Sequence, residues 1–539
     1  MDIKSIILAV ALSVGILVGW NYIAGHMGWL PKPDLVKVEK QPTAAPPAEQ
    51  KNEVPGPLAL GVFTPSEGRA VTVRTPLYRA VLHSGGGVLK SFELHRYRMA
   101  VAPDSAPVNL IDETTAAVAP LGLLINGQPS WNTGRWAFEG DNLALAAGQQ
   151  GKLRLIGELD GLRVERELIF FADTYIISER LSVYTLGDMA RTVRIAFTTG
   201  ASMGSVGAGG SYDPMRIGWG LNGKFDEETS EKDLSSKGVT GTGNYGWAAA
   251  MSNYFMNAIL PADTEGLTLK GRLQNTVYRV ALERPDTLVY PGEAKVLEVS
   301  YWYGPKDRVL LKDAPNNLAQ SIDLGIFSFI AVALMWLLAF FYTYAGNWGI
   351  SIILLTVLIK ILFWPLTAKS FKSMEKMKQL NPLMQKIREK HANDKESMNK
   401  EIMGLYKTYG VNPASGCVPI LVQLPVFFGL YQALMTALEL RHASFITYLP
   451  GTDWLWLADL SSKDPTYITP LLMGATMFLQ QRLTPATGDP MQQKIMMFLP
   501  VVFTFLFLNF PCGLVVYWLI NNVLTIAQQW LMLRKKAAT

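Results

Sequence analysis

The 539-residue chain contains very few of the residues that build disulfide frameworks and metal centres. Its only two cysteines, Cys417 and Cys512, lie near the ends of different apolar runs, so neither a disulfide framework nor a cysteine-based metal cluster can form. We expect both to be free thiols that act as small packing residues. The five histidines are scattered along the chain, and no H-E-x-x-H pair of a zinc protease occurs.

A complete nucleotide-binding loop is also missing. Residues Gly218–Lys224 match G-x-x-x-x-G-K, but Phe225 occupies the place of the Ser or Thr that such a loop needs for magnesium. The segment is expected to be a turn in a water-facing outer domain, where ATP is not expected. We therefore predict that the protein is not an enzyme and uses no cofactor or metal ion.

Apolar sequence is abundant, but it is unevenly distributed. Apolar residues make up 49% of the chain, which carries a net charge of +5. Residues 58–312 have the character of a soluble, strand-rich body, whereas the region after about residue 320 is a series of apolar runs. This division predicts a membrane protein with a large water-facing domain.

The N-terminal residues 1–25 have a short charged start and then an apolar run from Ile6 to Ile23. A cleaved signal peptide is the alternative, but the run is long for one and no A-x-A-like site follows it. We predict an uncleaved transmembrane signal anchor. Residues 31–57 are rich in Pro, Ala and charge, a composition that cannot bury a core and is typical of a flexible linker.

The domain at 58–312 is predicted to be a large all-β domain. Short segments of alternating apolar and polar residues recur in it, bounded by Gly, Asp, Asn and Pro, as is typical of antiparallel strands. They include AVTVRT, KLRLIGEL, LRVERELIF, YIISERLSVYTL, RTVRIAFTT and VYRVALER. The fold class expected for such a series is a β-sandwich.

The region at 347–534 is predicted to be a five-helix transmembrane core, because each of its apolar runs is close to the ~20 residues that a helix needs to cross the hydrocarbon. The expected spans are 347–366, 416–438, 466–483, 495–511 and 513–532. The segment 369–410 between the first two has ten Lys/Arg against five Asp/Glu, which favours the cytoplasm. Alternation then places the β domain outside and the N-terminus in the cytoplasm.

The apolar segment at 320–346 does not fit this alternation. If it crossed the membrane, the β domain would move to the cytoplasmic side. We expect an amphipathic helix that lies on the outer interface, and a spanning helix is the alternative.

The basic segment 369–410 has apolar residues at three- and four-residue spacing, with a break at residues 391–394. This pattern predicts two amphipathic helices. They form either a solvated hairpin that packs on itself or a basic, methionine-rich platform for anionic lipid, the ribosome or apolar nascent segments.

Lys360 is the unusual residue of the first expected span. A lysine at the centre of a bilayer costs roughly 2.5–3.5 kcal/mol on insertion scales. Its ammonium could snorkel toward an interface marked by Trp364. Alternatively, it faces a wet hollow together with Thr356 and the polar residues of the other spans. No carboxylate lies at a matching depth, because Glu439 is at the outer end of its span. An unpaired lysine favours the binding of an anionic group from another molecule.

Four stretches resemble the core of the YidC/Oxa family of membrane protein insertases. They are NWGISIILLTVLIKILFWPL, VNPASGCVPILVQLPVFFGLY, DPMQQKIMMFLP and FPCGLVVYWLINNVLTIAQQ. The order of the expected elements matches too, and the large outer domain indicates the Gram-negative form of the family. The resemblance implies a chaperone that inserts and folds newly made proteins of the bacterial inner membrane, alone or with the Sec translocon, without nucleotide hydrolysis. It implies a super-sandwich fold for the periplasmic domain.

The resemblance also implies a hydrophilic groove whose wall carries a positive residue. That residue is usually arginine, and this chain has lysine there, which keeps the charge but loses the planar, bidentate fork. Combined with the polar residues of the spans, the expected groove is Lys360, Thr356, Gln423, Asn509, Tyr517, Trp518 and Asn521. The expected apolar slide for substrates is Phe427, Phe428, Met435, Phe503 and Phe507.

The expected partners are nascent inner-membrane proteins, the Sec translocon and the phospholipid bilayer, and no nucleic acid is bound directly. Contact with the ribosome and the signal recognition machinery is expected to be weak, because only LRKKAAT follows the last span. A secondary transporter or channel is the rival function, since intramembrane lysines also mark ion pathways. A third possibility is an outer-face assembly chaperone anchored by its spans.

Overall fold

The computed structural model describes residue 63 and residues 68–102, 104–206, 213–391, 394–411, 418–483 and 490–537. The expected anchor at 1–25, the linker at 31–57 and Cys417 lie outside the described residues.

The β domain is built around a nine-stranded sheet in the order β15-β14-β17-β18-β22-β11-β10-β9-β7. Its strands are β15 (Lys224–Glu228), β14 (Arg216–Leu221), β17 (Tyr245–Met251), β18 (Phe255–Pro261), β22 (Lys295–Pro305), β11 (Ile176–Thr185), β10 (Leu162–Phe171), β9 (Gln150–Leu159) and β7 (Arg135–Glu139). Each neighbouring pair in this sheet is antiparallel.

Two further sheets complete the β domain. The six-stranded sheet contains β16 (Val239–Gly243), β19 (Leu267–Gln274), β20 (Val277–Glu283), β13 (Ile195–Ser202), β5 (Leu123–Ile125) and β6 (Gln128–Pro129), in that order. The five-stranded sheet contains β4 (Pro107–Asn109), β3 (Val88–Arg98), β2 (Tyr78–His83), β1 (Ala70–Arg74) and β8 (Leu143–Ala144). A short ribbon pairs β12 (Arg191–Val193) with β21 (Thr287–Val289).

Three short helical turns of the domain lie between strands, and two more follow β22. They are α2 (Glu113–Ala116), α3 (Ser130–Thr133), α4 (Glu231–Ser236), α5 (Arg308–Lys312) and the 3-10 segment η1 (Pro315–Ser321).

Alternation of apolar and polar residues produces these strands. In β10 and β11, buried and more exposed positions alternate along each strand, as the period of two requires. The turn between β9 and β10 is Asp160–Gly161, with φ of 50° and 67°. A two-residue hairpin of this kind needs positive φ at both positions, and Asp-Gly suits it because glycine has no Cβ.

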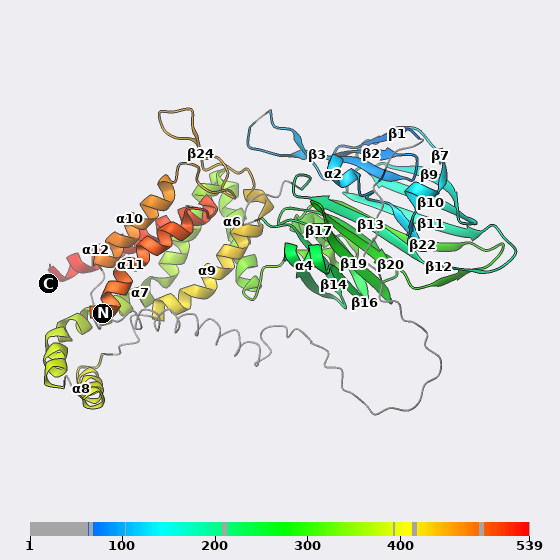
Figure 1. The fold of residues 1–539 in the computed structure, drawn as a ribbon. Coiled ribbons are helices and arrows are strands. Elements are labelled where there is room, and N and C mark those ends of the chain that lie inside the picture. Colours follow the sequence, from blue (N-terminus) through cyan, green and yellow to red (C-terminus); the bar gives the residue numbers. More distant parts are fainter. Residues whose placement is uncertain are drawn as a thin grey trace, which may run out of the picture. The chain divides into compact units, whose positions relative to one another are not determined.

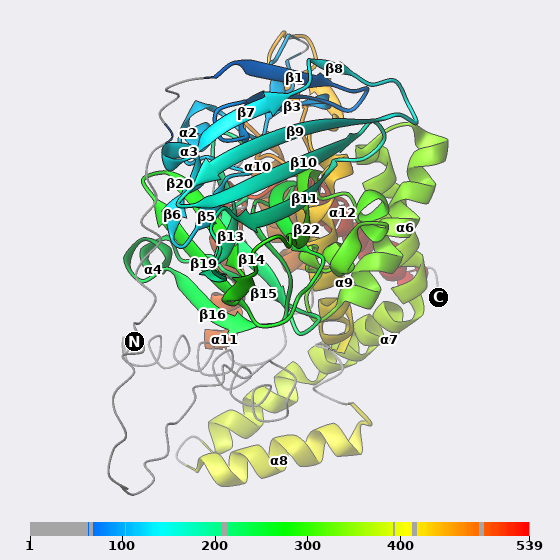
Figure 2. The ribbon, with the colours of Figure 1, turned by 90° about the vertical axis from the view of Figure 1, so that its right-hand side faces the viewer.

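The sheets stack as layers around one hydrophobic core (Figures 1 and 2). Strand β18 is buried along its whole length, because other parts of the domain cover both of its faces. The prediction of a large β-sandwich is confirmed, and the quoted strand segments fall on β1, β9, β10, β11, β12–β13 and β20.

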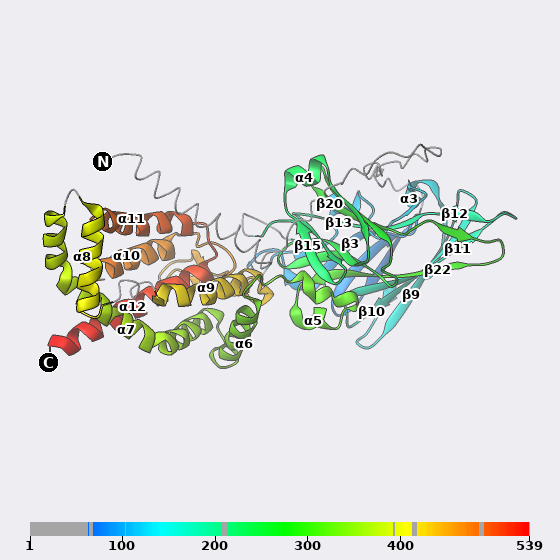
Figure 3. The same ribbon diagram turned by 90° about the horizontal axis from the view of Figure 1, so that it is seen from below.

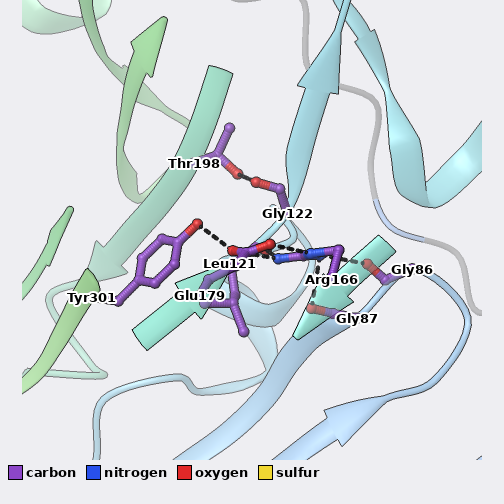
Figure 4. A network of polar contacts seen from close by, with 8 residues as sticks. All are labelled: Gly86, Gly87, Leu121, Gly122, Arg166, Glu179, Thr198 and Tyr301. Atoms are coloured by element: carbon purple, nitrogen blue, oxygen red, sulfur yellow. Dashed lines mark hydrogen bonds and ion pairs between the residues drawn. The ribbon is translucent and has the colours of Figure 1, made fainter. Parts of the chain in front are cut away.

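A buried ion pair crosses this core (Figure 4). Arg166 and Glu179 face each other across β10 and β11, both side chains are 0% exposed, and Arg166 Nε lies 2.5 Å from Glu179 Oε1. The guanidinium also donates to the carbonyls of Gly86, Gly87 and Leu121, at 3.1, 3.3 and 2.6 Å. Tyr301 donates its hydroxyl to Glu179 Oε2 at 3.0 Å.

The electrostatics of this pair depend on both partners. Burial disfavours the charged guanidinium, yet the facing carboxylate holds the pKa of Arg166 above its ordinary value. The pair therefore stays charged inside the core, and each partner depends on the other.

The C-terminal region is helical. Its long helices are α6 (Ser328–Ala345), α7 (Trp348–Lys390), α8 (Lys395–Thr408), α9 (Val418–Thr436), α10 (Ile468–Leu483), α11 (Pro490–Phe507) and α12 (Cys512–Ala537). Between α9 and α10 lie the 3-10 turn Leu438–Leu440 and a small hairpin of β23 (Ile446–Tyr448) and β24 (Leu455–Leu457). Helices α6, α7, α9, α10, α11 and α12 share one apolar core. Figure 3 shows α10 and α11 side by side.

Two of the described helices, α6 and α7, are long and apolar enough to cross a membrane by length and composition. Val422–Thr436 and Met496–Phe507 are shorter apolar helices. The count of five spans therefore stays a prediction.

Helix α7 continues past the end of the first expected span at residue 366. It runs unbroken for 43 residues through Pro365 and Pro382, so the first expected span and the first helix of the basic segment are one helix. A proline removes one backbone N–H, which bends a helix more often than it ends one in apolar surroundings. Thr367 donates its hydroxyl to the carbonyl of Phe363 at 2.8 Å, next to the proline.

Helix α6 corrects the expectation of an amphipathic helix at 320–346. The helix contains no charged residue, and its exposed side chains include Phe329, Trp336 and Phe340. Its packed side is apolar too, with Leu334 and Leu338 in the core. The interfacial position of α6 stays a prediction, with a membrane-spanning helix as the alternative.

The basic segment forms two helices that separate near residues 391–394, as predicted. Asp394 caps α8 by accepting from the backbone N–H groups of Glu396 and Ser397. Glu401 of α8 pairs with the end of α7, with Oε1 at 3.2 Å from Lys390 Nζ and Oε2 at 2.5 Å from His391 Nε2. Met377 and Leu380 of α7 form a small apolar cluster with Val411.

Candidate functional site

Helices α9, α10, α11 and α12 enclose a cavity of about 690 Å³. The aromatic side chains that line it are Phe427, Phe428, Tyr431, Phe503, Phe507, Phe510, Tyr517 and Trp518. The amide side chains that line it are Gln423, Gln480, Gln481, Asn521 and Asn522. No charged side chain is among the described residues that line this cavity, which has one polar and one aromatic part.

Trp518 is the centre of the aromatic part. Its ring centroid lies 4.9 Å from that of Phe427 on α9, and 5.8 and 5.0 Å from those of Phe503 and Phe507 on α11. Edge-to-face and tilted pairs at these distances are attractive. One α12 side chain thus holds the two helices that carry the expected slide.

The amide part lies about one helical turn from Trp518. Gln423 Nε2 donates to Asn521 Oδ1 at 3.4 Å, which links α9 to α12. Asn522 is 2% exposed, and its Nδ2 lies 3.4 Å from the carbonyl of Met473 and 3.3 Å from the hydroxyl of Thr476 on α10. The hydroxyl of Tyr517 lies beside Gln423 without a hydrogen bond of ordinary geometry. Amides both donate and accept, so this part can bind the backbone groups of another chain.

Lys360 does not line the cavity. Its Nζ donates to Thr525 Oγ1 of α12 at 2.6 Å, and Thr525 Oγ1 donates to the carbonyl of Asn521 at 2.6 Å. These bonds end on the backbone carbonyl of Asn521, about one turn along α12, and not on its side chain, which lines the cavity. Thr356 is buried and donates its hydroxyl to the carbonyl of Ile352 within α7.

The expected site residues divide into two groups. The cavity brings together Gln423, Tyr517, Trp518, Asn521, Phe427, Phe428, Phe503 and Phe507. Four others do not line it: Lys360, Thr356, Asn509 and Met435. Asn509 is exposed in the turn after α11, because that helix ends at Phe507 rather than at residue 511. Met435 is buried near the end of α9.

Sequence reasoning missed Gln480, Gln481, Asn522 and Thr525. The first two are an amide pair at the end of an expected span, and the last two follow Asn521 on the same helix. Polar residues of this kind inside apolar runs are the signal that points to them.

The expectation that the sequence contains no hydrolase-type G-x-S-x-G pattern is wrong. Residues Gly200–Gly204 match G-x-S-x-G, the pattern of a nucleophile elbow. Ser202 ends strand β13, is buried, and donates its hydroxyl to Asp112 Oδ2 at 2.8 Å rather than to a histidine. A turn follows at 203–206 instead of the helix that an elbow opens. Residues Gly200–Gly204 therefore form the end of β13 and the start of a turn, not a nucleophile elbow.

The segment Gly218–Lys224 is a β-hairpin whose turn is limited to two residues, so the predicted turn is shorter than the segment. Asn222 and Gly223 connect β14 to β15 with φ of 52° and 73°, and Gly218 itself lies inside β14. Among the described residues, no group of three or more His, Cys, Asp or Glu side chains could hold a metal ion.

Gly474 sets the separation of α10 from α11. A Cβ built at this glycine meets the side chain of Thr504 on α11 at a distance that real atoms do not adopt. Small residues of this kind let transmembrane helices approach closely. The part of the cavity wall that α10 and α11 form therefore depends on the absence of a side chain at Gly474.

Gly474→Val is expected to destabilise the helical core by about 1–3 kcal/mol, because the two helices must separate. The measurement is the thermal unfolding midpoint of the purified chain in detergent. Gly404→Val in α8 is the matched control, since a Cβ there meets nothing within 4 Å. Equal midpoints for the two variants would contradict the close contact.

Comparison with known proteins accounts for nearly the whole chain. Residues 70–337 match the family model of the YidC periplasmic domain, and residues 340–539 match that of the 60Kd inner membrane protein. The membrane protein insertase YidC of Nitratidesulfovibrio vulgaris (strain Miyazaki F) is 60% identical over 541 residues, which cover 99% of this chain and 100% of the relative. The chain belongs to the YidC family.

A second curated relative agrees with this assignment. The membrane protein insertase YidC of Lawsonia intracellularis is 49% identical over 535 residues, covering 99% of this chain and 100% of the relative. A crystal structure of an active YidC insertase, with its first transmembrane domain resolved, is 16% identical with a TM-score of 0.35 and covers 87% of this chain and 94% of that one. This YidC-family chain is therefore a membrane protein insertase of the inner membrane, with a periplasmic β domain and apolar helices.

Proposed function

We propose that this insertase receives the polar flank of a client chain in the cavity between α9, α10, α11 and α12. The observation that supports this proposal is the pairing of five amide side chains with an aromatic wall in one cavity of about 690 Å³. A peptide group moved into hydrocarbon without a partner costs roughly 2–7 kcal/mol, depending on the reference state. Amides that donate and accept replace part of the lost hydration, so the polar flank crosses at lower cost.

The apolar segment of the client slides along the aromatic side of the same site. Phe427 and Phe428 on α9 and Phe503 and Phe507 on α11 form that side, and Phe428 is exposed. Burial of apolar surface in the bilayer, at roughly 25 cal/mol per Å², then drives release of the segment into lipid. No step of this mechanism requires a nucleotide.

Lys360 supplies a positive charge next to the amide part of the cavity. Its ammonium is hydrogen-bonded to Thr525, one helical turn along α12 from Asn521, so its field acts on a client tail that occupies the cavity. An acidic tail gains from this field and from a membrane potential worth ~2.3 kcal/mol per charge per 100 mV. We infer that clients with acidic outer tails depend on Lys360 more than clients with neutral tails.

The proposed topology follows the positive-inside tendency. The N-terminus and the hairpin of α7 and α8 lie in the cytoplasm, where the basic residues of the hairpin meet anionic lipid and ribosome-bound chains. The β domain lies in the periplasm. The insertase works alone or beside the Sec translocon, and its contact with the ribosome and the signal recognition machinery is weak.

Site-specific photocrosslinking tests the proposal. A crosslinker at Trp518 or Asn521 is expected to capture a ribosome-bound membrane protein during insertion, because both residues line the cavity. Leu362 is the matched control: it is exposed and apolar on α7 but does not line the cavity. Equal capture from Leu362 and Asn521 would argue against a defined client site.

A further inference from the structure

Thr525 makes two short hydrogen bonds in the helical core. Lys360 Nζ donates to its Oγ1 at 2.6 Å, and Oγ1 in turn donates to the carbonyl of Asn521 at 2.6 Å. A hydroxyl has one proton to donate, and here it donates that proton in the hydrogen bond to the carbonyl of Asn521. The lone pairs of Thr525 therefore point at the ammonium, and the residue acts toward Lys360 as an acceptor only.

This geometry decides where the charge of Lys360 lies. The ammonium comes from α7, but it is bound on α12 one turn from Asn521, which lines the cavity and accepts from Gln423. The side chain of Thr525 has little freedom, since the residue is only 5% exposed. Without this acceptor, the flexible stem of the lysine is free to snorkel along α7 toward an interface.

We propose that Thr525 is a positioning residue for Lys360: it holds the ammonium beside the amide part of the cavity and thereby sets the preference of the insertase for acidic client tails. This proposal rests on the proposed function of Lys360. It adds a residue 165 positions away in the sequence that acts on the client through the lysine.

The test compares two matched clients that differ only in whether the outer tail is acidic or neutral. Insertion of each into vesicles containing the full-length insertase is measured, and the readout is the ratio of acidic-tail to neutral-tail insertion. Thr525→Val and Thr525→Ala remove the acceptor, Thr525→Ser keeps it, and Lys360→Met removes the charge. Two acceptor-free variants are used, so that if one of them fails to fold, the other can still be measured.

The acceptor-free variants are expected to lower the ratio about tenfold, toward the value for Lys360→Met, because a hydrogen bond to a charged group is worth about that factor. Thr525→Ser is expected to keep the ratio within about twofold, since its hydroxyl can accept in the same way. An equal loss for both clients would mean a structural role only and would overturn the proposal.

The variant of the lysine separates this proposal from the one on which it rests. A normal ratio in Lys360→Met would overturn the role of the charge itself. A lowered ratio in Lys360→Met with a normal ratio in both acceptor-free variants would overturn only the positioning role of Thr525.

Discussion

Arg166→Met is expected to destabilise the periplasmic β domain by about 3–5 kcal/mol, because it leaves the carboxylate of Glu179 buried without its counter-charge. The remaining donor to that carboxylate is the hydroxyl of Tyr301, at 3.0 Å. The carbonyls of Gly86, Gly87 and Leu121 lose their donor in the same variant. The loss is measured on the full chain in detergent, as the urea concentration at which protease cleaves the β domain.

An exposed ion pair of the same domain provides the control. Arg194 and Asp286 lie 2.7 Å apart, with side chains that are 50% and 49% exposed. Arg194→Met is expected to cost less than about 1 kcal/mol, since water screens both charges. Equal losses for Arg166→Met and Arg194→Met would contradict the role assigned to the buried pair.

A double variant distinguishes the charge from the network around it. In Arg166→Met with Glu179→Leu, no buried charge remains, so part of the stability should return. The recovery is incomplete, because three carbonyls and the Tyr301 hydroxyl stay without partners.

Lys360→Glu is expected to lower the insertion of clients with acidic outer tails by at least about tenfold relative to clients with neutral tails. At a separation of about 6 Å and an effective dielectric of about 20, reversing the sign turns an attraction of about 3 kcal/mol into a repulsion of the same size. The new carboxylate would also face the lone pairs of Thr525. The measurement is quantitative insertion of both client classes into vesicles.

Two further variants complete this experiment. Lys360→Arg keeps the charge and is expected to retain the preference for acidic tails, whereas Lys360→Met should fall between the wild type and Lys360→Glu. If Lys360→Glu inserts the two client classes equally well, the lysine has no charge role.

Much of the β domain could be predicted from local pattern alone. Strands such as β10 and β11 alternate cleanly, because one face of each packs on the core and the other is more open. Pairing order could not be predicted, since it depends on contacts such as Asn257 Nδ2 with the carbonyl of Leu110, which are 147 residues apart. The Arg166–Glu179 pair could not be predicted either. Charged residues on a strand usually mark its open face, so nothing in the sequence indicated that these two are buried.

In the helical core, composition located the helices but not their ends. Apolar sequence continues past Phe507 into the turn that holds Asn509, so the expected span ran four residues too far. The first expected span ends at residue 366, whereas α7 continues to Lys390. Composition also revealed Lys360 as unusual, but its partner Thr525 comes from a distant helix, and only the packed structure brings the two together.

The unbroken helix α7 has a mechanical consequence. With 43 residues at about 1.5 Å each, it is a rod of about 65 Å that carries Lys360 in its N-terminal third and ends at the hairpin contact of Lys390 and His391 with Glu401. We infer that a load on the hairpin of α7 and α8 is transmitted along this helix toward Lys360. Pro365 and Pro382 are the positions at which we expect the helix to bend, and Pro365 lies little more than one turn from the lysine.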